Sequence, residues 1–153
     1  MALVGFVGLS LLVAAADASV SAARVSAWYL SLPAPPLAPP VVIIQPLSIL
    51  LHLMLGVSAW RVWRRGSPVA VRTTLKWWGW LLLFDALWPP TFFGLHRPDV
   101  ALVLIAPLLL LVAAALRGFR RIDRVAAALM FPYALWMCYA AYLVAGFVWL
   151  NPN

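Results

Sequence analysis

Long runs of apolar residues alternate with short polar segments along the chain. A helix that crosses the hydrocarbon core of a bilayer needs about 20 apolar residues, because each residue advances it by roughly 1.5 Å. Five runs approach or exceed this length, and the fourth reaches it when it extends into Arg117. The pattern therefore predicts five membrane-spanning helices, over residues 2–23, 41–63, 77–95, 100–116 and 125–150.

The runs are continuously apolar, so they do not fit the alternating strands of a membrane barrel. Helices also pair all backbone groups internally, which lipid requires. Composition agrees, since 66% of the 153 residues are hydrophobic and 10% are charged. We therefore predict an all-α integral membrane protein, with one domain over residues 1–153 built as a five-transmembrane-helix bundle. The first run lacks the basic region that opens a signal peptide, so we expect it to be retained.

Basic residues are concentrated in two segments between apolar runs. Nine of the 11 Lys and Arg residues lie within 61–76 and 117–124. Because such residues mark the cytoplasmic side, we predict that both basic loops and the N-terminus are cytoplasmic if the protein lies in an inner membrane. The C-terminus, Arg24 and Arg97 would then lie opposite, and which membrane holds the protein stays open. No basic face interleaves with aromatic residues, so we expect no nucleic-acid partner.

The segment between the first two predicted helices is rich in proline. Residues 31–40 read SLPAPPLAPP and contain five prolines. Proline fixes φ and removes a hydrogen-bond donor, so this segment is expected to be a stiff, extended strap. The strap is either a rigid connector or a preformed lid over an opening between helices, and composition does not separate these two interpretations.

Two ionisable residues are expected at membrane depth. Asp85 lies in the middle of the third apolar run, where an ionised carboxylate costs several kcal/mol, and we expect it to face the bundle interior. Trp88 and Phe92 follow at i+3 and i+7 and share its face. His52, inside the second run, is its candidate partner; the alternative is that each bonds a nearby carbonyl or hydroxyl. Asp17 lies closer to a helix end and is less informative.

Neither a catalytic nor a metal-binding motif is visible in the sequence. The two histidines, four acids and single cysteine do not cluster along the chain, and there is no HExxH or glycine-rich phosphate loop. We therefore expect a non-enzymatic protein without a metal centre.

Several motifs together resemble one known family. The first is WY followed by spaced prolines (Trp28, Tyr29, Leu32, Pro35, Pro39, Pro40, Pro46), the second is LLLFDALWPPTFFGLHRP (81–98), and the third is PYALW (132–136) with a terminal LN (150–151). These are similar to the WY…PP…P, QLxxNxxWxxxFFGxxRP and PYxxW…LN motifs of the TspO/MBR family, which includes tryptophan-rich sensory proteins and the mitochondrial translocator protein. The resemblance covers essentially the whole chain.

The resemblance implies a five-helix bundle, usually a homodimer, with a cavity near the first loop. Relatives bind porphyrins such as protoporphyrin IX and haem, or sterols, as ligands and not as required cofactors. Carried onto this sequence, the expected ligand-binding residues are Trp28, Tyr29, Pro39, Pro40, His52, Asp85, Trp88, Phe92, Phe93, Tyr133, Trp136 and Ala140.

The sequence departs from the family pattern at six positions. They are Leu37, Val42, Ser48, His52, Asp85 and Val144, where the pattern has Trp, an aromatic residue, Trp, Tyr, Asn and Asn. A lost ring removes stacking area worth roughly 1–3 kcal/mol, so porphyrin affinity is expected to be weaker than in relatives. His52 and Asp85 make the cavity more ionisable. We expect His52 to offer an axial nitrogen to haem, or the pair to bind a different polar ligand.

Three functions fit these observations. The leading one is a membrane receptor or carrier for a small hydrophobic ligand, either a tetrapyrrole or a sterol-like molecule. The second is a small proton-coupled transporter, because intramembrane acids such as Asp17 and Asp85 often titrate in transport. The third, implied by the resemblance, is light-dependent porphyrin degradation.

Overall fold

The computed structural model of the chain is helical throughout its described part. It describes residues 1–24 and 27–151, without the side chains of 20–24, 27 and 41, so the predicted side of the Arg24 side chain lies outside the described residues. The elements are α1 (Ala2–Arg24), α2 (Ala27–Ser31), α3 (Val41–Arg65), α4 (Pro68–Pro89), the π-helical turn η1 (Pro90–Gly94), α5 (Pro98–Ile122) and α6 (Arg124–Leu150). The predicted all-α class is confirmed.

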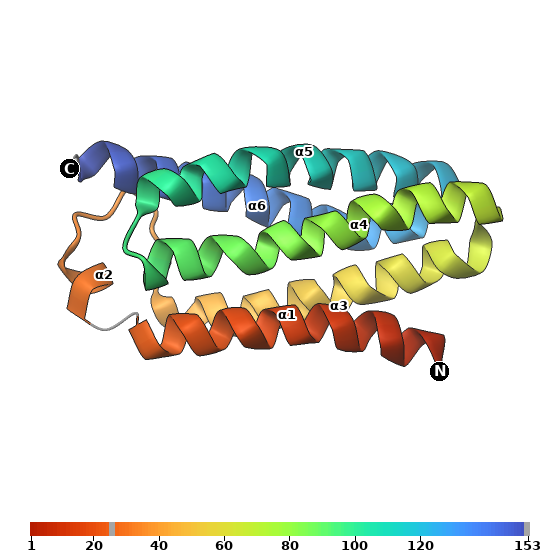
Figure 1. Cartoon of the computed structure of the whole chain (residues 1–153), viewed down its shortest axis with the longest axis horizontal. Coiled ribbons are helices and arrows are strands. Elements are labelled where there is room, and N and C mark those ends of the chain that lie inside the picture. Colours follow the sequence, from red (N-terminus) through yellow and green to blue (C-terminus); the bar gives the residue numbers. More distant parts are fainter. Residues whose placement is uncertain (25–26, 152–153) are drawn as a thin grey trace.

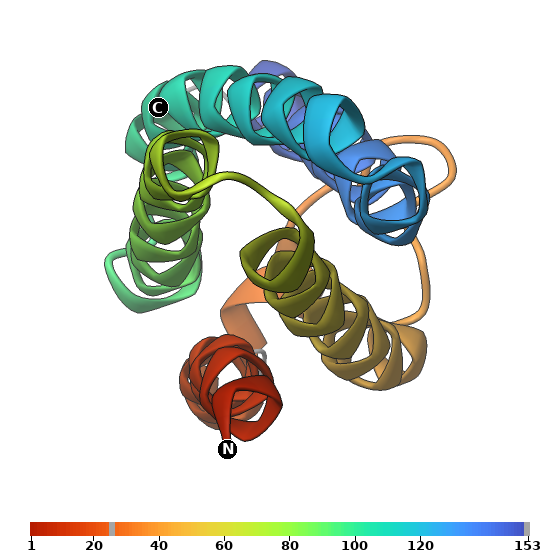
Figure 2. The ribbon, with the colours of Figure 1, turned by 90° about the vertical axis from the view of Figure 1, so that its right-hand side faces the viewer.

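Five long helices run along one axis and form a ring (Figure 1). In the end-on view of Figure 2 the order around the ring is α1, α3, α6, α5 and α4, and each helix packs against its two neighbours. Three of these five contacts join long helices that follow one another along the chain (α1 with α3, α4 with α5, and α5 with α6), and two join helices that are distant in sequence (α3 with α6, and α1 with α4). The short helix α2 and the proline strap lie at the end of the bundle away from the N-terminus.

Within the described residues, four helices are long and apolar enough to cross a membrane: α1, α3, α5 and α6. The predicted count of five spans is therefore one too many by this measure. The exception is α4, because Arg72, Lys76 and Asp85 and several Trp residues interrupt its apolar character. Helix α4 nevertheless closes the ring by packing between α5 and α1.

The segments predicted as basic loops are mostly the ends of helices, which corrects the predicted boundaries. Helix α3 continues to Arg65 and α4 starts at Pro68, so only Gly66 and Ser67 connect them. Proline suits the first position of a helix, because its fixed φ is helical and its missing N–H would have no partner there. This explains why α4 starts at Pro68. Likewise α5 continues to Ile122 beyond the predicted end at 116. The polar residues at these ends of α3, α4 and α5 are helical, although they lie outside the apolar runs from which the boundaries are predicted.

Asp123 forms the whole connection between α5 and α6, and it ties this turn to α3. Its Oδ1 accepts a hydrogen bond from the Val125 amide at 3.0 Å and caps α6. Its Oδ2 accepts from Arg61 Nε at 2.8 Å, and Arg65 Nη1 lies 3.3 Å from Oδ1. Burial raises the pKa of Asp123, but these hydrogen bonds and the charges of Arg61 and Arg65 outweigh it and hold the pKa below its ordinary value.

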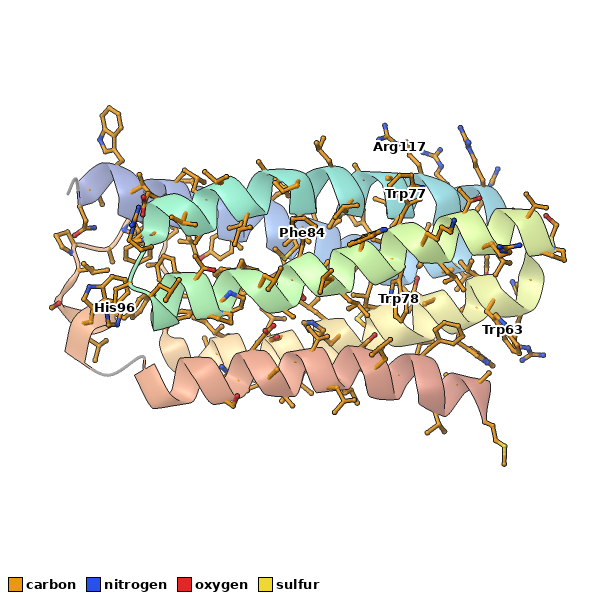
Figure 3. All side chains as sticks on the ribbon, viewed as in Figure 1. Trp63, Trp77, Trp78, Phe84, His96 and Arg117 are labelled. Carbon is orange, nitrogen blue, oxygen red and sulfur yellow. The ribbon has the colours of Figure 1, made fainter. Side chains whose placement is uncertain are left out.

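The two basic segments, 61–76 and 117–124, lie at one end of the bundle, as the sequence predicts. Figure 3 shows Arg117 and Trp63 toward that end and His96 at the other. The N-terminus lies at the basic end, while the strap and the end of α6 lie opposite (Figure 1). Which side of a membrane the basic end faces stays a prediction.

Two adjacent prolines end α4 and start the π-helical turn η1. Pro89 and Pro90 have no amide hydrogen, so carbonyls one turn earlier lose their helical donors. The chain widens, with the Leu95 amide donating to the Pro90 carbonyl at 3.0 Å, and Thr91 Oγ1 donates to the Leu87 carbonyl at 2.8 Å. This wide turn places Phe92 in the bundle interior, where it is 2% exposed.

Candidate ligand-binding cavity

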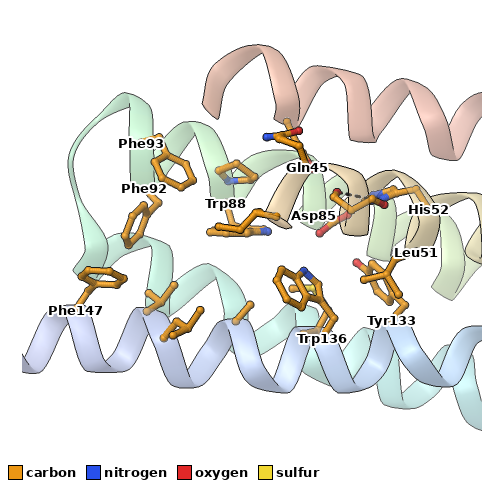
Figure 4. A pocket seen from close by; sticks show the side chains of 18 of the residues that line it. Gln45, Leu51, His52, Asp85, Trp88, Phe92, Phe93, Tyr133, Trp136 and Phe147 are labelled. Carbon is orange, nitrogen blue, oxygen red and sulfur yellow. Dashed lines mark hydrogen bonds and ion pairs between the residues drawn. The ribbon is translucent and has the colours of Figure 1, made fainter. Parts of the chain in front are cut away.

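A cavity of about 90 Å³ lies inside the bundle, in the half nearer the strap (Figure 4). Its wall comes from α1, α2, α3, α4, η1 and α6, whereas α5 contributes none of the residues that line it. The wall has an aromatic end and a polar end. This is the combination of apolar surface and a few polar groups that small-molecule sites usually show.

Aromatic rings from four elements pack against one another at the end of the cavity near η1. Phe92 and Phe93 meet edge to face, with ring centroids 4.8 Å apart and planes at 70°. Tyr29 from α2 lies 5.3 Å from Phe147 of α6, and Trp88 of α4 lies 6.3 Å from Phe92. These contacts join α2, α4, η1 and α6 in one cluster, so the aromatic end is a packed wall.

His52 and Asp85 form the polar end and are hydrogen-bonded to each other, which confirms the predicted contact. His52 Nε2 lies 2.9 Å from Asp85 Oδ2, and both residues are 3% exposed. The other ring nitrogen, Nδ1, lies 2.9 Å from the Ser48 carbonyl. Because a carbonyl only accepts, Nδ1 is the donor of that bond. The bond between Nε2 and Oδ2 therefore contains one further proton, and the two residues share it (Figure 4).

Asp17 joins this pair from α1, an approach that the sequence pattern does not predict. One ligand atom each from Asp17, His52 and Asp85 lies within 4.8 Å of the other two. Asp17 Oδ1 is buried and has no hydrogen-bond partner among the described residues, and the same holds for the Tyr133 hydroxyl. The polar end thus brings together three ionisable groups from α1, α3 and α4.

Most of the predicted ligand-binding residues line this cavity. Those on its wall are Tyr29, His52, Asp85, Trp88, Phe92, Phe93, Tyr133, Trp136 and Ala140. Trp28, Pro39 and Pro40 are not among the lining residues. The Trp28 ring lies instead 4.4 Å from the His96 ring and 5.9 Å from Phe92, outside the aromatic wall. Contact of all twelve residues with a ligand stays a prediction.

The positions that depart from the family pattern fall into two groups. Ser48 and Val144 line the cavity beside His52 and Asp85, so four of the six changes alter its wall. Leu37 and Val42 are 81% and 77% exposed. Exchange of an aromatic residue at these two places therefore leaves the cavity wall unchanged.

The proline strap is fixed to the outer part of α6. Tyr139 Oη donates to the Leu37 carbonyl at 2.5 Å, Tyr142 Oη donates to the Pro36 carbonyl at 3.0 Å, and Asn151 Nδ2 donates to the Pro33 carbonyl at 3.2 Å. None of residues 32–40 is among the lining residues of the cavity. Of the two interpretations of the strap, these contacts favour a rigid connector.

Fold and cavity together define an integral, multi-pass membrane protein: a helical bundle with an internal, ring-lined cavity. The TspO/MBR family model matches residues 6–150, and the chain belongs to this family. It is 29% identical over 150 residues to the tryptophan-rich protein TspO of Chlorobaculum tepidum, covering 95% of this chain and 93% of that protein. It is 30% identical over 118 residues to the translocator protein of Ovis aries, covering 76% and 70%. The tryptophan-rich sensory protein of Cereibacter sphaeroides is 33% identical over 110 residues, covering 71% and 67%.

Proposed function

We propose that this protein is a membrane receptor or carrier that binds a small hydrophobic ligand in the cavity between its helices. The observation that carries the proposal is the division of the cavity wall into an aromatic end and the His52–Asp85 polar end. Aromatic faces supply apolar contact, and a few polar groups fix orientation. Names such as translocator protein and tryptophan-rich sensory protein among the relatives agree with this class of function.

Tetrapyrroles such as protoporphyrin IX and haem are the first candidate ligands, and sterol-like molecules are the second. The cavity of about 90 Å³ is well below the roughly 300–1,000 Å³ of sites for drug-sized ligands. A porphyrin therefore fits only if the wall opens. Trp88 and Trp136 have large side chains on the cavity wall, and both are partly exposed. Rotation of these two side chains is therefore the simplest way to enlarge the cavity.

A titration of the purified protein tests the proposal. Protoporphyrin IX and haem are added to protein in detergent micelles, and tryptophan fluorescence and the Soret band are followed. We expect saturable binding of about one ligand per cavity. Uptake that rises without saturation, as in micelles lacking protein, would contradict the proposal.

His52 is our candidate for the axial ligand of haem within this function. Both of its ring nitrogens are hydrogen-bonded, so haem ligation requires that Nε2 leave Asp85. The haem spectrum of His52→Ala is the test, with His96→Ala as the matched control. A changed visible spectrum in His52→Ala alone supports axial ligation, and identical spectra in the two variants and the wild type exclude it.

A proton-coupled transporter is the second candidate, because the cavity wall holds Asp17, His52 and Asp85 at membrane depth. Uptake into proteoliposomes distinguishes the two functions. A transporter accumulates ligand only when a proton gradient is imposed, whereas a receptor binds the same amount with or without one. Homodimer formation also remains a proposal from family membership.

A further inference from the structure

We propose that Asp17, His52 and Asp85 form a binding site for a first-row divalent transition metal ion such as Zn²⁺. Their three ligand atoms come from α1, α3 and α4 and lie within 4.8 Å of one another. In the tetrahedral shell that Zn²⁺ prefers, ligand atoms at about 2.1 Å from the ion lie about 3.4 Å apart. Side-chain rotation therefore has to bring the three ligand atoms closer together by up to about 1.4 Å to complete the site.

The hydrogen bond on the far side of the His52 ring orients it for this role. Nδ1 donates to the Ser48 carbonyl at 2.9 Å, so Nε2 faces the two acids. Histidines that bind metals almost always donate their other ring N–H to a carbonyl or a carboxylate, which fixes the tautomer and the ring plane. His52 therefore already has the supporting hydrogen bond of a metal ligand.

Charge balance favours a divalent ion at this place. A single shared proton satisfies His52 and Asp85, but the salt bridges of the described residues leave Asp17 without a counter-charge. An ionised carboxylate without a partner is costly in an apolar bundle, so Asp17 takes up either a proton or a cation. Two carboxylates and a neutral imidazole around a divalent ion carry no net charge, so the ion compensates all three groups together.

Two unpartnered polar atoms give independent support for a ligand here. The Tyr133 side chain is 1% exposed, lines the cavity, and has no hydrogen-bond partner for its hydroxyl among the described residues. Its ring stands edge-on to His52, with centroids 5.9 Å apart, and Figure 4 shows both residues at the polar end. Asp17 Oδ1 is likewise unpartnered. Buried polar atoms are nearly always paired, so the unpartnered Asp17 oxygen points to a ligand, and a water bound to the same ion would lie within reach of the Tyr133 hydroxyl.

The donor set indicates which ions the site takes. One imidazole nitrogen and two carboxylate oxygens suit Zn²⁺, Co²⁺, Fe²⁺ and Mn²⁺. Mg²⁺ and Ca²⁺ prefer a full shell of oxygen ligands, which these residues do not offer. The inference uses the ion alone and does not depend on binding of a hydrophobic ligand.

Co²⁺ is the probe for the test, because its visible d–d bands report coordination by the protein. Full-length protein in detergent is treated with chelator and titrated with Co²⁺, and Zn²⁺ is then added. We expect one Co²⁺ per chain and loss of its bands as Zn²⁺ displaces it. His52→Ala and Asp17→Asn are expected to weaken binding at least about tenfold, whereas the controls His96→Ala and Asp99→Asn leave it unchanged.

Asp17→Asn keeps the experiment decisive if other variants fold poorly, because it preserves the shape of the side chain. Zn²⁺ is also expected to raise the melting temperature of the wild type and not of this variant, since an ion that binds only the folded state stabilises it. Absence of Co²⁺ bands in the wild type would overturn the proposal. Equal affinity in the wild type and in folded Asp17→Asn would overturn it as well.

Discussion

At the residue scale, two positions that set this chain apart from its family pattern form one hydrogen bond. His52 and Asp85 stand where the pattern has Tyr and Asn, and Nε2 and Oδ2 lie 2.9 Å apart. A Tyr and an Asn are both neutral, whereas a lone Asp at membrane depth needs a proton or a cation. Each replacement therefore supplies the hydrogen-bond partner that the other needs in the bundle interior. We expect either replacement without the other to leave a buried polar group unpaired.

Asp123 gives a pH-dependent prediction at the same scale. Its folded pKa lies below the ordinary value, so its contribution to stability is complete above the unfolded pKa of about 4 and is lost as pH falls through the folded pKa. Asp123→Asn is expected to lower the unfolding free energy at neutral pH by about 1–3 kcal/mol. Thermal unfolding followed by circular dichroism between neutral and strongly acidic pH measures both variants. The difference between them should shrink on the acid side, and a constant difference would show that Asp123 is not the group involved.

The sequence predicts the pairing of His52 with Asp85 but not the approach of Asp17, and the reason is geometric. At roughly 1.5 Å per residue, Asp17, His52 and Asp85 lie about 22, 20 and 26 Å from the basic ends of their helices, which is a similar depth. The helix boundaries therefore predict that the three residues lie at a similar depth in the bundle. Which faces of α1, α3 and α4 turn toward one another depends on packing, which the sequence pattern does not give.

At the element scale, close approach of another segment explains Gly56 and Gly146, which lie inside helices. A Cβ on Gly56 of α3 would lie 2.7 Å from Val7 Cα and 2.9 Å from the Phe6 carbonyl oxygen, both backbone atoms of α1. On α6, a Cβ at Gly146 would lie 2.6 Å from Cβ of Pro35 in the strap. These glycines let α1 and the strap reach the bundle, and α1 brings Asp17 to the site.

Gly56→Ala is therefore expected to destabilise the protein by about 1–3 kcal/mol, because the added methyl group meets backbone that has to move. Gly79→Ala on α4 is the matched control, since nothing lies within 4 Å of its Cβ position. The control is expected to be neutral or stabilising by up to about 1 kcal/mol, from the better helix propensity of alanine. Melting temperatures in one detergent compare the variants. Equal stability of Gly56→Ala and Gly79→Ala would refute the close contact of α1 with α3.

Helix existence follows from the apolar runs, but the helix ends do not. The predicted start at 77 misses nine residues of α4, because Arg72 and Lys76 break the apolar run without breaking the helix. The only sequence signal for the start of α4 at Pro68 is the pair Ser67–Pro68, which is typical of a helix N-terminus. A basic residue beside an apolar run therefore does not mark the end of the helix.

At the scale of the whole molecule, five helices in a ring enclose a cavity that α5 does not touch. Motif resemblance predicts the positions of nine residues on its wall, because these positions recur on the helices of a shared fold, although His52 and Asp85 replace the residues of the pattern. The volume of about 90 Å³ depends on how the side chains of the wall pack, which no motif encodes. The central claim is that this cavity is the place where a hydrophobic ligand binds.

Filling the cavity tests that claim most directly. Ala140 on α6 lines the cavity and is 5% exposed, while Ala145 on the same helix is exposed and is not among the lining residues. Protoporphyrin IX is titrated against the wild type, Ala140→Phe and Ala145→Phe, with circular dichroism as the check on folding. The account predicts equal affinity for the wild type and Ala145→Phe, and at least about tenfold weaker binding by Ala140→Phe, whose ring occupies the site. Equal affinity in all three folded proteins would contradict it.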